Sequence, residues 1–574
     1  MTTIRKIVGI HPDEGKETFL FFLYFFCLIA SIIIGKTARD VFFLSRFNPS
    51  FLPHIFIISA ACVMVTTIFF IRSARNKDIF LFAKITVSLF ALSLLLINTF
   101  LNKWTYPLLY VWIDIIGAIL VPQFWLLANT QFTTRQAKRL FGPISAASAF
   151  ANIFIGFSIQ YGIIVPKLLL PVASIFLFLS LLIIYTIKNN TPANGIGQTH
   201  DSKEKRNTDV SIFTSIRHHK YIGLLCVIVA VASITITLIE YQFKIIASNT
   251  YDENQLVSLF GMLYGIVGLV SGFMQVFVIS RILRKFGVLI GLLILPVFLG
   301  ITSMFLTLNP VIIFALMARL SDLILRFSFH DITMQILWLP VSGKLKQSAK
   351  PFIDGTVKNT AQGLAGLLIL GIIGFIGSQF INILIIVLII AWIICSVLLK
   401  NGYLHQLKEA VGKRELNLET LRINITDPYL VDLFKNTLIS GNDEQKLFVL
   451  NEIQKLSPGS WGNELTEIFH NGTNNIRNQI LKIAHSDNQI LPDSVITDLV
   501  NSPDDPLRSK GIIIATKRRL THIIPSLENL LINVNPDLQA SANTALIILG
   551  EDGVENARAK LYKMLNETNI KSQI

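Results

Sequence analysis

The feature that most constrains this chain is a series of apolar stretches, each long enough to cross a membrane. A membrane-spanning helix needs about 20 predominantly apolar residues. Twelve stretches qualify, at 19–38, 53–72, 79–101, 105–130, 141–165, 168–187, 221–245, 254–280, 286–307, 309–335, 354–377 and 380–399. Only 15% of residues are charged, against about 25% in soluble domains. The sequence therefore predicts an all-α, polytopic membrane protein with twelve transmembrane helices.

Basic residues are concentrated in every second gap between these stretches. They are Arg72, Arg75 and Lys77; Arg135, Lys138 and Arg139; Lys203, Lys205, Arg206, Arg217 and Lys220; Arg281, Arg284 and Lys285; and Lys344, Lys346 and Lys350. Because lysine and arginine accumulate in cytoplasmic loops, both termini are predicted to be cytoplasmic. The same bias explains the net charge of +14, so no nucleic-acid partner is expected.

The longest interior gap divides the spans into two sets of six. The predicted domains are an N-terminal membrane half (1–187), a cytoplasmic linker (188–220), a C-terminal membrane half (221–400) and a soluble tail (401–574). Two six-helix halves joined by such a linker resemble the major facilitator fold.

The tail contains a repeat of 31 residues. Apolar or small residues recur in three copies, at Ile476, Leu507 and Leu538, then four positions later at Ile480, Gly511 and Ala542, and then three positions later at Ile483, Ile514 and Ala545. This spacing puts the side chains on one helix face, and stacked helix pairs share a core. The pattern resembles HEAT or armadillo repeats, with an ordinary helical domain as the alternative, and it supplies no catalytic group.

Charged residues inside the predicted spans are the candidate functional residues, since such groups are costly in a membrane and commonly mark a substrate pathway. They are Lys36, Arg39 and Asp40 on the first span; Asp114 on the fourth; Glu240 and Lys244 on the seventh; and Arg319, Asp322, Arg326 and His330 on one stripe of the tenth, with Asp331 beside it. In the major facilitator layout, spans one, four, seven and ten correspond to one another and line the central cavity. The aromatic residues Tyr110, Trp125, Tyr241 and Trp338 could stack on a base.

Arginines in a desolvated cavity favour phosphate or carboxylate, which they bind through paired hydrogen bonds. We predict substrate binding by Lys36, Arg39, Asp114, Glu240, Lys244, Arg326 and Asp331. If the carboxylates hold the cations while no anion is bound, the empty carrier reorients slowly and exchanges substrates. Two alternatives remain open: Asp114 or Glu240 could take a proton and give symport, or Arg39–Asp114 and Arg326–Glu240 could be purely structural ion pairs.

Three segments carry a family resemblance that covers roughly residues 17–400. They are "YVWIDIIGAILVPQFWLLANTQFTTRQAKRLFGPISAASAFANIFIGF" from Tyr110, "TLIEYQFKIIASNTYDENQLVSLFGMLYG" from Thr237 and "RFSFHDITMQILWLPVSGKLKQSAKPFIDG" from Arg326. Together they resemble the non-mitochondrial ATP/ADP carriers of plastids and intracellular bacteria. The resemblance implies a nucleotide or other phosphorylated anion as substrate, a lipid bilayer as surroundings and a bacterial inner membrane as location.

The resemblance also implies functional residues. The family's basic residue of helix one and its acids of helices four and seven carry over as Arg39, Asp114 and Glu240. Its helix-ten lysine is replaced by Met334, which leaves the number of phosphates in the substrate open. A regulatory or partner-binding role is expected for the tail, because repeat solenoids are mainly binding surfaces.

The sequence also bears on two other function classes. A carrier-like receptor or scaffold that acts through its tail is the alternative to a transporter. An enzyme is not expected, because the sequence contains no phosphate-binding glycine loop, metal-ligand cluster or nucleophile–base pair. No cofactor is predicted, and Cys27, Cys62, Cys226 and Cys395 lie in apolar stretches and are expected to be buried thiols.

Overall fold

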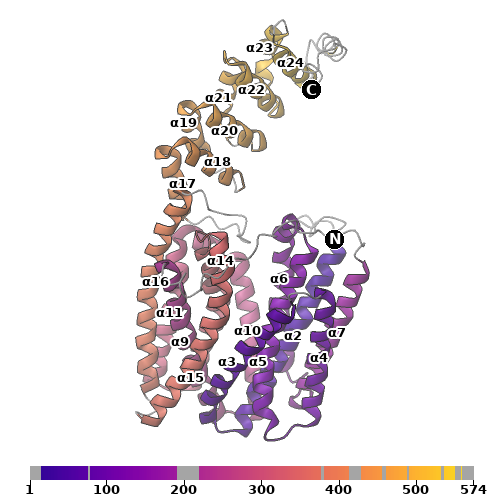
Figure 1. The fold of residues 1–574 in the computed structure, drawn as a ribbon, viewed down its shortest axis with the longest axis vertical. Helices are drawn as coiled ribbons and strands as arrows, with labels where there is room; N and C mark the ends of the chain where they lie inside the picture. Colours follow the sequence, from indigo (N-terminus) through magenta and orange to yellow (C-terminus); the bar gives the residue numbers. More distant parts are fainter. Residues whose placement is uncertain are drawn as a thin grey trace. The chain divides into compact units, whose positions relative to one another are not determined.

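A computed structural model describes residues 14–74, 78–190, 219–375, 380–412, 428–455, 461–487, 490–531, 535–549 and 558. The regular structure in these ranges is helical (Figure 1). The chain forms two compact units, Met1–Gln406 with Glu419–Asp427, and Leu407–Leu418 with Pro428–Ile574. Most of the predicted linker, 188–220, lies outside the described residues.

The first half of the first unit contains six long helices. They are α2 (Gly15–Arg46), α3 (Leu52–Ala74), α4 (Ile79–Thr99), α5 (Thr105–Gln131), α6 (Thr134–Gln160) and α7 (Leu169–Asn190). Each follows one of the predicted apolar stretches. Helix α6 begins at a capping box, in which the Thr133 side chain accepts from the Gln136 backbone and Gln136 accepts from the Thr133 backbone.

The second half contains both continuous and interrupted helices. The continuous ones are α9 (Lys220–Thr250), α10 (Glu253–Phe277), α11 (Ile279–Leu308) and α16 (Phe380–Gly412). The interrupted ones are α12 (Ile312–Leu325), the π-helix η4 (Arg326–His330) and α13 (Asp331–Leu337), followed by α14 (Gly343–Pro351), the π-helix η5 (Phe352–Val357) and α15 (Lys358–Phe375). Helix α11 kinks at Gly287, whose φ of 71° favours glycine.

Ten helices among the described residues are long and apolar enough to cross a membrane, where the sequence predicts twelve. The difference falls on the predicted tenth and eleventh spans. The tenth, 309–335, is divided among α12, η4 and α13, and the eleventh, 354–377, is divided between η5 and α15. π turns often occur where a helix serves a functional site.

Glycines allow helices of the two halves to touch backbone to backbone. A methyl group added to Gly156 of α6 would lie 2.3 Å from the backbone nitrogen of Gly265 in α10. One added to Gly366 of α15 would lie 2.7 Å from the carbonyl oxygen of Pro53 in α3. No larger residue fits at these positions without moving a helix.

The second unit consists of short helices in succession (Figure 1). They are α17 (Pro428–Ser440), α18 (Asp443–Lys455), α19 (Gly462–Asn471), α20 (Asn474–Ser486), α21 (Asp493–Val500), α22 (Asp505–Lys517), α23 (Ile524–Leu530) and α24 (Pro536–Leu549). Helices α18, α20, α22 and α24 contact one another in that order. The nine positions of the 31-residue pattern lie on α20, α22 and α24, and all are buried.

Candidate substrate site

Eight charged side chains form a continuous chain of alternating sign through the first unit. In order they are Asp114, Arg39, Asp40, Lys244, Glu240, Arg319, Asp322 and Arg326, and each is within ion-pair distance of the next. We call this set the charge chain. Burying a charge is costly unless it is paired, and every inner member lies between two charges of opposite sign. The formal charges of its members sum to zero.

The first half contributes the beginning of the charge chain. Arg39 of α2 donates from Nη1 to Asp114 Oδ1 on α5, and its guanidinium lies 4.4 Å from the centre of the Tyr110 ring. Ser59 of α3 donates to the other carboxylate oxygen, Asp114 Oδ2, at 2.5 Å. Arg39 Nε also lies 3.3 Å from Oδ1 of Asp40, the next residue along α2. Side chains of three helices in one half thus form a connected network around the Arg39–Asp114 ion pair.

The charge chain crosses between the halves at Asp40 and Lys244. Lys244 Nζ on α9 lies 2.9 Å from Asp40 Oδ1 and donates to the hydroxyl oxygen of Tyr110 at 2.6 Å. Asp40 is 3% exposed and Lys244 is 1% exposed, so this contact is withdrawn from solvent. A second ion pair between the halves, Arg46–Glu253 at 3.0 Å, is one-third exposed on both sides.

The second half contributes the remaining members of the charge chain. Glu240, one turn before Lys244 on α9, accepts from Lys244 Nζ at 2.6 Å and lies 3.0 Å from Arg319 Nη2 of α12. Arg319 donates to Asp322 at 2.9 Å, and Arg326 lies 3.3 Å from the same carboxylate oxygen. The spacings of three and four residues put both arginines beside Asp322 on one helix face.

The structure brings together most, but not all, of the predicted site residues. Arg39, Asp114, Glu240, Lys244 and Arg326 belong to the charge chain. Arg39 pairs with Asp114 as considered from the sequence, whereas Arg326 pairs with Asp322 rather than with Glu240.

Three other charged candidates lie outside the charge chain. Lys36 is half-buried one turn before Arg39, and its ammonium has no hydrogen-bond or ion-pair partner among the described residues. Asp331 is exposed just after the π turn. His330 packs edge-on against Trp392 of α16, with its ring centre 5.4 Å away.

Sequence reasoning left three members of the charge chain out of the predicted site. Asp40, Arg319 and Asp322 were recognised as charges within spans but were not selected. Asp40 is next to Arg39, Asp322 is four residues from Arg326, and Arg319 is two helix turns before Arg326 on the same stripe, and these spacings are the signal that could have identified them. Ser59 was missed because a serine in an apolar helix carries no signal of its own.

The aromatic candidates have different positions. Tyr110 lies against Arg39 and Lys244. Trp125 packs among Phe25, Phe124 and Phe141. Tyr241 and Trp338 are buried. Tyr110 is thus in direct contact with two members of the charge chain.

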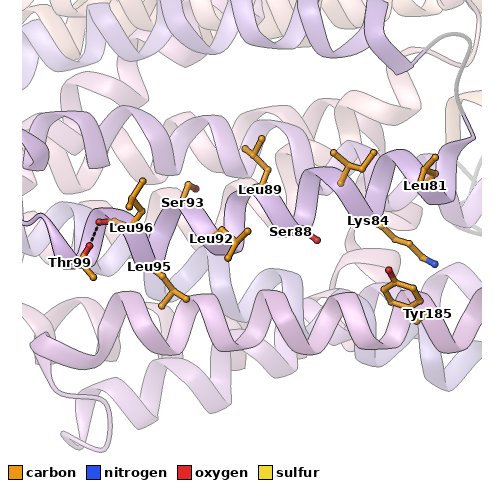
Figure 2. A pocket seen from close by; sticks show the side chains of 11 residues that line it. Leu81, Lys84, Ser88, Leu89, Leu92, Ser93, Leu95, Leu96, Thr99 and Tyr185 are labelled. Carbon is orange, nitrogen blue, oxygen red and sulfur yellow. Dashed lines mark hydrogen bonds between the residues drawn. The ribbon is translucent and has the colours of Figure 1, made fainter.

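A separate groove of about 920 Å³ lies between α4 and α7 (Figure 2). Figure 2 shows leucine side chains along most of its length, with Lys84 and Tyr185 together at one end. Lys84 Nζ lies 3.5 Å from the centre of the Tyr185 ring. With one cation and a mainly aliphatic lining, this groove does not suit a nucleotide.

Comparison with known proteins gives a family match. The model of the family described as TLC ATP/ADP transporter matches residues 76–403. ADP,ATP carrier protein 3 of Rickettsia felis is 24% identical over 303 residues, which cover 44% of this chain and 60% of that carrier. ADP,ATP carrier protein 1 of Chlamydia pneumoniae is 21% identical over 487 residues, which cover 69% of this chain and 93% of that carrier. The chain thus spans about 60% of the length of the Rickettsia carriers that it matches.

Solved transporter structures are similar to about two thirds of this chain. The nucleoside transporter NupG is 12% identical, with a TM-score of 0.47 over 68% of this chain and 99% of that one. A bacterial homologue of the human lysosomal transporter Spinster, solved in an inward-facing and unoccupied conformation, is 12% identical, with a TM-score of 0.49 over 69% of this chain and 98% of that one.

Proposed function

We propose that this chain, which belongs to the TLC ATP/ADP transporter family, exchanges nucleotides or closely related phosphorylated anions across a membrane by alternating access. The charge chain is the observation that carries the proposal. Its four cations and four carboxylates continue from the first membrane half into the second through the Asp40–Lys244 contact, and Arg39, Asp114 and Glu240 among them are the residues that the resemblance aligns with the family's charged positions. Guanidinium and ammonium groups in a dry site bind phosphate strongly, and the carboxylates keep these cations paired when no phosphate is present.

The proposed cycle uses the competition between the carboxylates and the substrate. Without substrate, Asp40 holds Lys244 across the halves, and this contact opposes their separation. A phosphate that binds beside Arg39 and takes Lys244 as its partner displaces Asp40 from Lys244, and Asp40 keeps Arg39. The halves then no longer depend on the Asp40–Lys244 contact and can rearrange. Reorientation is therefore faster with cargo than without it, which produces exchange rather than one-way flow.

We propose substrate binding by the seven predicted residues, Lys36, Arg39, Asp114, Glu240, Lys244, Arg326 and Asp331, and extend the site to Asp40, Arg319, Asp322 and Tyr110. Arg319 supports this extension because it joins Glu240 to Asp322. It supplies a helix-ten cation at a different position from Met334.

The membrane arrangement is proposed as well. The ten long helices, together with the interrupted segments α12–α13 and α14–α15, would make twelve spans, with both termini in the cytoplasm of a bacterium and the protein in its inner membrane. The contacts between the halves described above lie toward the C-terminal ends of α2, α6 and α9. In this orientation the described conformation is closed on the side away from the cytoplasm.

For the second unit we propose a HEAT-like fold that regulates transport or binds a cytosolic protein. The support is the 31-residue spacing with buried residues at corresponding positions of α20, α22 and α24.

Transport by the purified full-length protein in liposomes tests the proposal. Uptake of labelled AMP, ADP and ATP is measured into vesicles preloaded with mixed unlabelled nucleotides and into empty vesicles. We expect uptake into the loaded vesicles only. A folded protein that takes up no nucleotide in either case contradicts nucleotide exchange and favours either another phosphorylated anion as cargo or a carrier-like receptor. Equal uptake into empty vesicles contradicts exchange, and acceleration by a proton gradient favours symport.

A further inference from the structure

We infer that the site prefers a nucleotide with a single phosphate, a nucleoside monophosphate, to a di- or triphosphate. The inference rests on the proposed function and concerns the charge that the site can compensate. A phosphate monoester carries about −1.5 to −2 charges at pH 7, and each further phosphate adds negative charge. The number of cations that a site offers without a paired carboxylate therefore limits the cargo.

The charge chain by itself offers no excess positive charge. Its cations Arg39, Lys244, Arg319 and Arg326 are matched by Asp40, Asp114, Glu240 and Asp322. Asp322 shows how firmly some of this charge is compensated, because it is fully buried and lies beside two guanidinium groups. An anion cannot release both arginines from Asp322 without leaving that carboxylate buried and unpaired.

Lys36 is the one cation near the charge chain that no carboxylate pairs within the described part of the protein. It lies one turn before Arg39 on α2, near enough to interact electrostatically with Arg39, Glu240, Arg326 and Asp40, although it forms no ion pair with either carboxylate. Its side chain is half-buried. A bound phosphate can gain Lys36 without displacing any carboxylate.

A monophosphate is therefore compensated by Lys36 together with the displacement of one ion pair. The pair at the crossing point, Lys244–Asp40, is the one whose release the exchange cycle requires. A triphosphate would need further cations, and each would have to come from a pair whose carboxylate then remains buried without a partner. The nearby Asp331, which is exposed just after the π turn, is a carboxylate and so does not supply a further cation for such a cargo.

The test compares initial rates of uptake of labelled AMP, ADP, ATP and adenosine into preloaded liposomes, each over a range of concentrations. We expect the ratio of maximal rate to half-saturating concentration for AMP to exceed that for ATP by about tenfold or more, because an uncompensated buried charge weakens binding at least that much. Adenosine, which has no charge, should be a poor substrate. A preference for ATP or ADP over AMP would overturn this inference while leaving nucleotide exchange intact. Absence of uptake for every nucleotide would instead overturn the proposed function.

Variants that change the charge of the site test whether this charge is what determines the preference for a monophosphate. Asp322→Asn removes one negative charge with little change of shape, and Met334→Lys adds one cation to the same interrupted helix. Both should shift the preference toward ADP and ATP, so the test survives if one of them fails to fold. Among these variants, Lys36→Gln should cause the largest reduction in AMP uptake.

The matched control is Lys84→Gln, which removes a half-buried lysine from the groove between α4 and α7 (Figure 2). It should leave the order of preference unchanged. If Asp322→Asn and Met334→Lys both fold and both retain the wild-type preference, the charge of the site does not select the cargo and the inference is wrong.

Discussion

Replacing Asp40 by asparagine should convert exchange into leakage. The same carboxylate oxygen, Asp40 Oδ1, lies 3.3 Å from Arg39 Nε and 2.9 Å from Lys244 Nζ. It is the direct ion-pair contact of the charge chain between the two halves. Asparagine has nearly the same shape but no charge, so the substitution removes the attraction while keeping the packing.

The burial of the Asp40–Lys244 ion pair determines how much Asp40→Asn should destabilise the closed empty state. Removing one partner of a buried ion pair costs about 3–5 kcal/mol. Arg39 keeps Asp114 and Lys244 keeps Glu240, so the lower end, about 3 kcal/mol, applies. At about 1.4 kcal/mol per factor of ten, the closed empty state loses on the order of 100-fold in population relative to states in which the halves have separated. Reorientation without cargo should become correspondingly more frequent.

The assay measures uptake of labelled nucleotide into empty and preloaded liposomes. The wild type should show uptake into loaded vesicles only, and Asp40→Asn should show substantial uptake into empty ones. Arg46→Gln is the control, because it breaks the other ion pair between the halves, Arg46–Glu253, which is one-third exposed. Exposed pairs contribute about 0–1 kcal/mol, so Arg46→Gln should remain an exchanger. The reasoning is refuted if Asp40→Asn transports at the wild-type rate into loaded vesicles and stays at background in empty ones.

Three further predictions concern binding and packing. Arg39→Gln removes the guanidinium that Asp114 and Asp40 share and should abolish uptake without unfolding the protein, whereas normal transport would exclude Arg39 from the site. Gly156→Ala places a methyl group 2.3 Å from the backbone of Gly265 and should lower the melting temperature. The control is Gly142→Ala on the same helix, whose methyl group meets nothing within 4 Å and should leave the melting temperature unchanged. Equal melting temperatures of the two variants would refute the close contact of α6 with α10. Ile480→Ala removes a fully buried side chain from α20 and should destabilise the second unit by about 2–5 kcal/mol. Denaturant unfolding of the full chain measures this loss, and the same change at the exposed Ile548 is the control. An Ile480→Ala variant as stable as the wild type would argue against the repeat core.

Much of the membrane architecture and the positions of the charged residues are readable from the sequence. Apolar runs mark helices because the bilayer leaves the chain few alternatives, and charges within them are rare enough to stand out. The pairing of these charges is less readable. Spacing places Arg319, Asp322 and Arg326 on one stripe, but it does not say that Arg319 rather than Arg326 reaches Glu240 on α9.

The π turns and the glycine contacts are also hidden from sequence patterns. A π turn adds a residue to one turn of helix, and no residue type marks η4, so 309–335 reads as one continuous span. Glycine within an apolar run reads as another small apolar residue, and Gly156 differs from Gly142 only in what lies opposite it in the fold. The glycine contacts depend on segments that are distant in the sequence.

The zero sum of the charge chain has an electrical consequence. A charge moved across a membrane potential exchanges about 2.3 kcal/mol per 100 mV, but a neutral set of side chains that shifts through the field as a group moves no net charge. The current carried by one exchange cycle is then set mainly by the difference in charge between the incoming and outgoing cargo. Exchange of two nucleotides of equal charge would be electrically silent, whereas exchange of nucleotides with different phosphate numbers would be driven in one direction by the membrane voltage.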